Sequence, residues 1–144
     1  VERSRGLGDV YKRQILNWPT RIQGISPVYW EMNIKKDIAR ICNDAAKMLD
    51  INLEFSHKMI NHDNNYVGKK YGATTEDGIK ATKLLANKEG IILDPVYTSK
   101  GFAALIDYVE KGIIKKGENV IFMFTGGSPA VFAYNDEIAN NSTQ

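Results

Sequence analysis

The sequence contains a single cysteine, Cys42, among its 144 residues. One cysteine cannot form an internal disulfide, which fits a protein of a reducing compartment, and we predict a cytoplasmic location. Cys42 lies on the apolar side of a helical pattern, and a free cysteine usually packs as a small hydrophobic side chain. We therefore predict that Cys42 is buried in the core.

The sequence also lacks long apolar runs and a surplus of positive charge. No segment approaches the ~20 apolar residues that a membrane span needs. The formal net charge is only +2, and the lysines are scattered without a basic cluster that could neutralise a phosphate backbone. We expect neither a membrane nor a nucleic acid as a partner. With 43% hydrophobic and 25% charged residues, the composition is that of one globular domain.

Clusters of metal-binding residue types are missing as well. His57 and His62 are five residues apart in a polar stretch, without cysteines or grouped carboxylates at ligand spacing. We interpret both as solvated loop histidines and predict no metal site.

The chain divides into three predicted regions. Residues 1–14 are polar and basic without the apolar centre of a secretory signal. Residues 4–14 resemble translated adaptor sequence, so we interpret 1–14 as a leader that is not native. Residues 15–134 are predicted to form an α/β domain, and 135–144 a polar tail. If this interpretation holds, the chain is truncated and the segment that natively preceded Ile15 is missing.

The first half of the domain predicts a short strand and one long helix. Residues 21–26 are predicted to be a strand that ends at Pro27, because proline cannot continue a central ladder. Apolar residues at three- and four-residue spacing predict a helix over residues 33–49. Mixed polarity and turn-prone residues over 51–70 predict a short strand and a long loop. The predicted inner face of the helix is Ile34, Ile38, Ile41, Ala45, Met48 and Leu49.

The second half predicts alternating helices and strands. Thr74 lies three residues ahead of Asp77, as in a capping box, and predicts a second helix that Gly90 ends. The apolar segments 91–93 and 120–124 are predicted to be buried strands, the second covered on both faces. This order predicts the α/β class, with a parallel sheet and helices on both faces. The predicted inner faces are Ile79, Thr82, Leu85 and Ala86 in the second helix, and Phe102, Leu105, Ile106 and Val109 in a third helix ending at Gly112.

Polar residues follow each of the last two predicted strands. Tyr97 and Thr98 come after the first, and Thr125, Gly126 and Gly127 after the second. Ligands of open α/β sheets bind at the carboxyl ends of the strands, so we expect a site between these two tips. Simpler interpretations remain open, because Thr98 also suits a helix cap, Tyr97 a rim aromatic and the two glycines a tight turn.

A family resemblance makes this site more specific. The motifs Asp94-Pro95-Val96-Tyr97-Thr98-Ser99-Lys100, Gly117-Glu118-Asn119-Val120 and Phe124-Thr125-Gly126-Gly127-Ser128-Pro129-Ala130 occur in one order and spacing, supported by Tyr66-Val67-Gly68 and Tyr71-Gly72. Over residues 21–134 the chain resembles the C-terminal part of the D-cysteine desulfhydrase and 1-aminocyclopropane-1-carboxylate deaminase family. These are pyridoxal-phosphate enzymes of the tryptophan synthase β-like fold, fold type II. The resemblance covers most of this chain but only about the last third of a family member.

The resemblance implies a role for each matching residue. Thr125 takes the position whose hydroxyl faces the pyridine nitrogen of pyridoxal phosphate, and Gly126 and Gly127 let the backbone approach the ring. Tyr97 and Tyr71 match two active-site tyrosines that stack on the cofactor or transfer protons. Thr98 matches a substrate-side position. The resemblance implies Glu at the position of Thr98 and Leu at the position of Thr125 in the deaminases. Threonine at both positions is the desulfhydrase pattern.

The resemblance also implies what this chain does not carry. The family's cofactor-linking lysine, its neighbouring serine and its phosphate-binding loop match positions before Ile15, so we expect the chain alone to be inactive. Lys100 matches a different lysine, which we interpret as a solvated or backbone-anchoring cation. Departures at Lys69-Lys70 and Ala73-Thr74 affect only local loop geometry.

The implied function is elimination of D-cysteine, or a related small amino acid, to pyruvate, ammonia and sulfide. The resemblance also implies a homodimer at full length. Two alternatives stay open: a 1-aminocyclopropane-1-carboxylate deaminase, and a non-catalytic α/β ligand-binding module.

Overall fold

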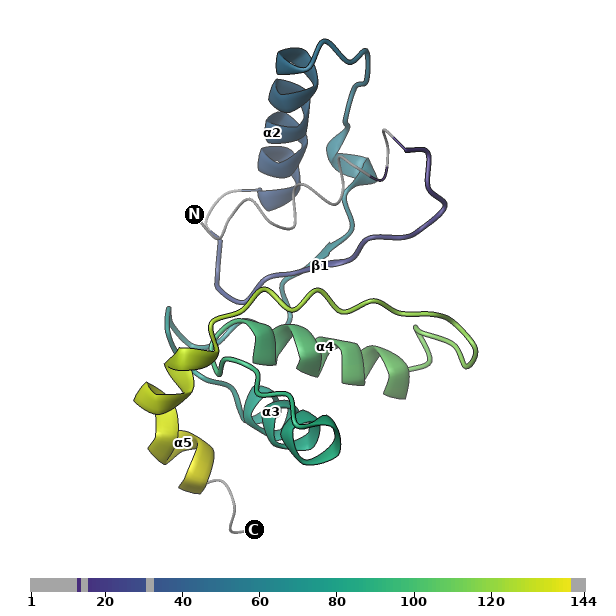
Figure 1. Cartoon of the computed structure of the whole chain (residues 1–144). Coiled ribbons are helices and arrows are strands. Elements are labelled where there is room, and N and C mark those ends of the chain that lie inside the picture. Colours follow the sequence, from purple (N-terminus) through teal and green to yellow (C-terminus); the bar gives the residue numbers. More distant parts are fainter. Residues whose placement is uncertain (1–12, 14–15, 31–32, 141–144) are drawn as a thin grey trace. The chain divides into compact units, whose positions relative to one another are not determined.

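A computed structural model describes Arg13 and residues 16–30 and 33–140 of the chain (Figure 1). These residues belong to two compact units, which we describe separately. The first includes Gly24 and the residues from 33 to 63, and the second includes residues 25–29 and continues from residue 64. Apart from Arg13, the predicted leader lies outside the described residues, as do residues 141–144 of the predicted tail.

The first unit is built on helix α2 (Ile34–Met48), which lies within one residue of the predicted bounds at each end. Asn33 caps its start by accepting a hydrogen bond from the Lys36 N–H at 3.2 Å. The small side chains Ala39, Cys42 and Ala46 pack against Phe55 and form the core of the unit. The predicted inner face of α2 is therefore wrong in part, since Met48 and Leu49 are 86% and 60% exposed. Cys42 is only 2% exposed, which confirms the prediction that it is a core residue.

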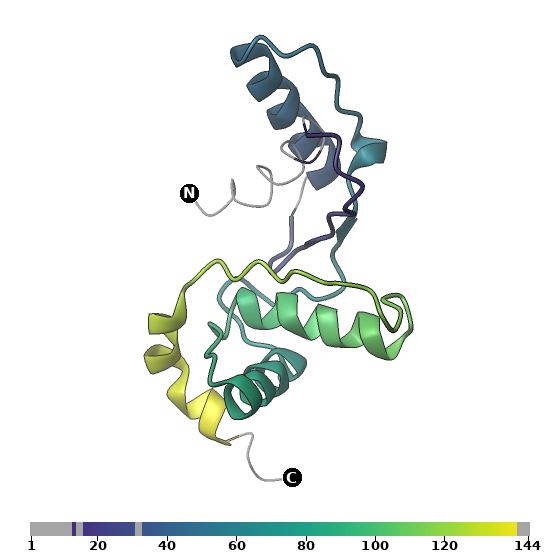
Figure 2. The same ribbon diagram turned by 45° about the vertical axis from the view of Figure 1, so that its right-hand side comes forward.

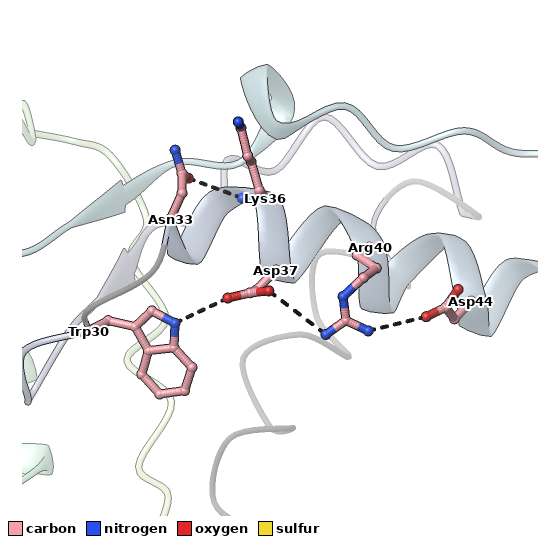
Figure 3. A network of polar contacts seen from close by, with 6 residues as sticks. All are labelled: Trp30, Asn33, Lys36, Asp37, Arg40 and Asp44. Atoms are coloured by element: carbon pink, nitrogen blue, oxygen red, sulfur yellow. Dashed lines mark hydrogen bonds and ion pairs between the residues drawn. The ribbon is translucent and has the colours of Figure 1, made fainter.

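The exposed side of α2 carries a chain of polar contacts (Figure 3). The indole N–H of Trp30 donates to Asp37 Oδ2 at 3.2 Å. Arg40 lies between two carboxylates, 3.8 Å from Asp37 and 3.4 Å from Asp44. Exposed pairs of this kind contribute roughly 0–1 kcal/mol each, so the buried face of the helix dominates its stability.

A side-chain clamp joins α2 to the following loop. Asn43 donates to the Phe55 carbonyl at 3.1 Å and accepts from the Phe55 N–H at 2.7 Å. The chain then forms a short 3-10 helix, η2 (His57–Met59), and strand β2 (His62–Asp63), which pairs with β1 (Gly24–Ile25). The predicted strand over 21–26 is therefore present but shorter. In the part of the chain that the structure describes, no three His, Cys, Asp or Glu residues are grouped as for a metal ion.

The second unit contains two helices packed side by side, α3 (Glu76–Glu89) and α4 (Thr98–Glu110) (Figure 2). Their first turns approach closely at Gly78, where a Cβ would lie 3.0 Å from Ser99 Oγ. Helix α3 ends at Gly90, whose φ of 68° is the left-handed conformation predicted for its C-cap. Its N-cap is Thr75, which accepts from the Gly78 N–H at 3.1 Å. The predicted capping box at Thr74 is wrong by one residue, because Thr75 is the residue with extended backbone before the first turn.

The predicted inner face of α4 is also shifted. The buried side chains of its middle are Ala103, Ala104 and Tyr108, whereas Val109 is 54% exposed. Small side chains on a buried helix face permit close packing, and the bulkier Leu105 and Ile106 are only half-buried. Phe102 is half-buried and packs edge to face on Phe122, with ring centroids 5.2 Å apart.

The two strands predicted at 91–93 and 120–124 are not formed in the structure. Both segments are irregular, and Ile121 is 87% exposed, so the prediction that the second is covered on both faces is wrong. A β-ladder requires a hydrogen-bonded neighbour, and the one sheet of the described residues is the β1–β2 pair. Leu93 is nevertheless buried, at the point where its segment leads into Asp94.

The C-terminal segment is helical. A 3-10 helix, η3 (Ser128–Tyr134), leads into α5 (Asn135–Asn140), which contacts α3. Over the described ranges, none of the helices combines the length and apolar character needed to cross a bilayer.

Candidate functional site

A buried carboxylate organises the turn that precedes α4. Asp94 is almost completely buried. Its Oδ1 accepts from the N–H groups of Val96 and Tyr97 at 3.0 and 2.7 Å. Its Oδ2 accepts from the N–H of Thr98 at 2.7 Å and from the Thr98 hydroxyl at 2.5 Å. These backbone donors have no partner within the helix, so Asp94 caps α4 from three residues before the N-cap residue, Tyr97.

The turn at Gly127 lies directly against this carboxylate. A Cβ built on Gly127 would lie 3.1 Å from Asp94 Cβ and 3.2 Å from its Cγ, closer than ordinary contact. The neighbouring Ser128 hydroxyl donates to the Ile92 carbonyl at 3.1 Å. The two predicted tips, one at Tyr97 and Thr98 and one at Thr125 to Gly127, therefore meet in the structure. This holds although neither tip follows a formed strand.

Two tyrosines predicted for the site also meet. The hydroxyl of Tyr97 donates to the hydroxyl of Tyr71 at 2.5 Å. Their rings are arranged edge to face, with centroids 6.3 Å apart and planes at 64°. Tyr71 is 76% exposed, so its phenol is accessible to a ligand.

A shallow concavity of about 440 Å³ adjoins Tyr71. Tyr134 borders it and donates to the Gly72 carbonyl at 2.9 Å, which ties η3 to the loop that carries Tyr71. The concavity is lined by Lys70, Tyr71, Gly72, Ala73, Thr74, Tyr134 and Glu137.

Lys100 lies under the site rather than in it. Its side chain is 0% exposed, and its ammonium donates to the Pro27 carbonyl at 2.9 Å. Burial lowers the pKa of the Lys100 amine, and the nearby Asp94 carboxylate opposes that shift. Of the two predicted alternatives, the backbone-anchoring cation is confirmed and the solvated one is wrong, because the side chain is buried and its ammonium is bonded to a backbone carbonyl.

The chain belongs to the family of pyridoxal-phosphate dependent enzymes, whose sequence profile matches residues 5–126. The cofactor of this family is pyridoxal phosphate.

The relatives of the chain include D-cysteine desulfhydrases. It is 47% identical over 74 residues to the D-cysteine desulfhydrase of Klebsiella pneumoniae, a match that covers 51% of this chain and 23% of that protein. It is 46% identical over 74 residues to the D-cysteine desulfhydrase of Yersinia pestis, with 51% and 22% covered.

Among solved structures, the chain resembles an ACC deaminase homologue, that is, a homologue of 1-aminocyclopropane-1-carboxylate deaminase. The TM-score is 0.83 at 27% identity, and the match covers 98% of this chain and 42% of that one. This likeness confirms the predicted α/β class and fold type II, to which the described residues contribute their helices and a small sheet.

The residues around Thr125 fit the family's cofactor. The φ angles of Gly126 and Gly127 are 93° and 90°, a backbone conformation that glycine adopts at low cost. A Cβ built on Gly126 meets no atom within 4 Å, so space is open beside this backbone. Thr125, the residue before Gly126, is half-buried. A flat, polar ring can therefore lie against this turn.

Two residues of the site were not identified from the sequence. Asp94 was identified only as the first residue of a family motif, although an Asp-Pro pair shortly before a helix also indicates a cap. Tyr134 had no signal, because its bond to Gly72 joins positions 62 residues apart.

Proposed function

We propose that this chain is part of a pyridoxal-phosphate-dependent lyase that converts D-cysteine and water to pyruvate, ammonia and hydrogen sulfide. One observation carries the proposal: Asp94 contacts both Thr98 and Gly127. The two positions with the desulfhydrase residue type, Thr98 and Thr125, therefore belong to turns that meet. The match to D-cysteine desulfhydrases supports the same activity, and the matched stretch spans about a quarter of those proteins.

The cofactor side of the site is assigned to the turn from Thr125 to Gly127. When bound, pyridoxal phosphate supplies the electron sink that stabilises negative charge at the α-carbon of an amino acid. Gly126 and Gly127 would hold the ring face, and the Thr125 hydroxyl would face the ring nitrogen. A neutral hydroxyl does not enforce protonation of that nitrogen, so it keeps the electron sink moderate. That strength suits removal of a proton followed by loss of a β-substituent.

The substrate side is assigned to Tyr97, Tyr71 and Thr98. Hydrogen-bonded phenols can hold a proton and pass it on, and the exposed Tyr71 is the member of the pair that a substrate reaches. Thr98 shapes the turn that carries Tyr97. The ligand is a small amino acid, for which the shallow concavity beside Tyr71 is sufficient.

A second candidate is cyclopropane ring opening, the activity suggested by the likeness to an ACC deaminase homologue. The residues at positions 98 and 125 favour the first candidate, because both are threonine. By the family resemblance, a deaminase has Glu at the position of Thr98 and Leu at the position of Thr125.

The proposed activity is tested with the pyridoxal-phosphate-loaded protein that carries this chain. We expect sulfide and pyruvate in equal amounts from D-cysteine, and much slower release of 2-oxobutanoate from 1-aminocyclopropane-1-carboxylate. Faster turnover of the cyclopropane substrate would assign the protein to the second candidate. If the loaded protein turned over neither substrate, the remaining function would be that of a non-catalytic α/β ligand-binding module.

A further inference from the structure

The hydroxyl of Thr98 is fully engaged with Asp94. Thr98 is only 5% exposed. Its hydroxyl proton is donated to Asp94 Oδ2 at 2.5 Å, and its oxygen accepts from the Asp94 N–H at 2.9 Å. A hydroxyl has one proton to donate. Thr98 therefore has no second proton to donate to a substrate, and its burial keeps it from direct contact with a ligand. Asp94 is then the neighbour through which position 98 acts on the site.

The same carboxylate also lies close to the opposite turn. A Cβ on Gly127 would lie 3.4 Å from Asp94 Oδ2, the oxygen that holds Thr98, and closer still to Cβ and Cγ. Asp94 therefore fills the space that a side chain at position 127 would occupy. A displacement of this carboxylate changes the packing against the Gly127 backbone.

We propose that Asp94 is a positioning residue that couples position 98 to the Gly126–Gly127 turn. This inference rests on the proposed function, in which that turn holds the cofactor ring. A substitution at position 98 then changes specificity by displacing the ring-facing turn, not by losing a contact with the substrate. A carboxylate at position 98 would meet Asp94 Oδ2 with charge of the same sign, so the turn would have to open.

The test compares Thr98→Ser with Thr98→Val in the ¹⁵N-labelled chain, without cofactor. Serine keeps the hydroxyl, whereas valine keeps the shape but leaves Oδ2 with one donor fewer. We expect Thr98→Val to accelerate amide hydrogen exchange at Val96 and Tyr97 by about tenfold or more. Losing a hydrogen bond to a charged group typically changes an equilibrium constant by that factor. It should also shift the amide resonances of Gly126 and Gly127. Thr98→Ser should leave both measurements near those of the parent.

Asp94→Asn provides a second arm, and Asp77→Asn is its matched control. Asp77 is an exposed aspartate in the first turn of α3. Removing its charge should leave the Gly126 and Gly127 resonances unchanged, while Asp94→Asn should shift them as Thr98→Val does. Equal effects of serine and valine at position 98, or unshifted glycine resonances with valine, would overturn the coupling. Neither readout involves substrate, so a loaded protein inactive on D-cysteine would refute the proposed function and leave the coupling standing.

Discussion

Tyr97 and Tyr71 form a hydrogen-bonded phenol pair, with their oxygens 2.5 Å apart, although 26 residues separate them in sequence. Tyr97 is placed by the Asp94 turn through its N–H. Tyr71 precedes Gly72, whose carbonyl accepts from Tyr134. Each phenol is thus fixed from a different part of the second unit. A substitution that moves either support should therefore change the positions of both tyrosine side chains.

Removing either phenolic hydroxyl should lower kcat strongly and the melting temperature only slightly. We expect Tyr71→Phe and Tyr97→Phe to reduce kcat for D-cysteine by at least about tenfold, because proton transfer by a positioned side chain typically contributes on the order of 10²–10⁴-fold. The melting temperature should change little for Tyr71→Phe, since that side chain is exposed. Tyr29→Phe is the control, because Tyr29 is equally exposed, at 76%. Unchanged kcat in both site variants would remove the tyrosines from the proposed mechanism.

Replacing Gly127 with alanine should lower the free energy of unfolding more than replacing Gly117. Both glycines have nearly the same φ, 90° and 92°, so alanine suffers similar backbone strain of about 1–2 kcal/mol at each. Only Gly127 adds a clash, with Asp94, whereas a Cβ on Gly117 meets nothing within 4 Å. We expect urea unfolding to show an additional loss of roughly 1–3 kcal/mol for Gly127→Ala. Equal losses would mean that the contact between Gly127 and Asp94 is not tight.

Lys100 should not react with pyridoxal phosphate. Burial lowers the pKa of its amine, which favours the reactive neutral form, but the group is enclosed and bonded to the Pro27 carbonyl. The enclosure of the amine should outweigh the effect of its lowered pKa on its reactivity. After incubation with the cofactor, reduction with borohydride and peptide mapping, we expect more label on the exposed Lys88 than on Lys100. Preferential labelling of Lys100 would contradict its role as a backbone anchor.

The stability of the chain should fall in mild alkali because of Cys42. Burial raises the pKa of its thiol above the ordinary 9.0, so the unfolded chain loses this proton at a lower pH than the folded one. The contribution is complete well below pH 9 and is lost progressively as the pH rises through 9 toward the pKa of the folded state. We expect a loss of up to about 0.8 kcal/mol by about pH 9.5 in urea unfolding of the parent chain. Cys42→Ala should lack this component of the pH dependence, and parallel curves for the two proteins would show that the thiol is not protected.

The sequence predicted the helices better than the strands for a physical reason. The bounds of α2 and α3 follow from capping residues such as Asn33 and Gly90, whose effect is local. A strand requires a partner, and segment 120–124 has none among the described residues, so its apolar composition alone did not decide its structure. The inner face of α4 was misassigned because Ala103 and Ala104, and not the largest apolar residues, are buried in its middle.

The candidate site was predictable only where motifs carried it. The polar residues after the predicted strands identified both tips, including Tyr97, and the family resemblance added Tyr71. The structure brings these parts together. It did not indicate how they are held, because the contacts of Asp94 with Gly127 and of Tyr134 with Gly72 join distant positions. The catalytic and binding roles of the predicted residues remain predictions.

The most direct test of the proposed function is a kinetic comparison of Thr98→Glu, Thr125→Leu and the double variant in the loaded protein, with D-cysteine and 1-aminocyclopropane-1-carboxylate as substrates. Thr125→Leu removes the hydroxyl assigned to the ring nitrogen, and Thr98→Glu places a second carboxylate beside Asp94. We predict that the double variant loses D-cysteine turnover and gains cyclopropane turnover. The two changes should be non-additive, because the Asp94 turn connects them. If kcat/KM for D-cysteine stayed within about twofold of the parent in all three variants, less than ~0.5 kcal/mol of transition-state free energy, the assignment of both threonines would be wrong.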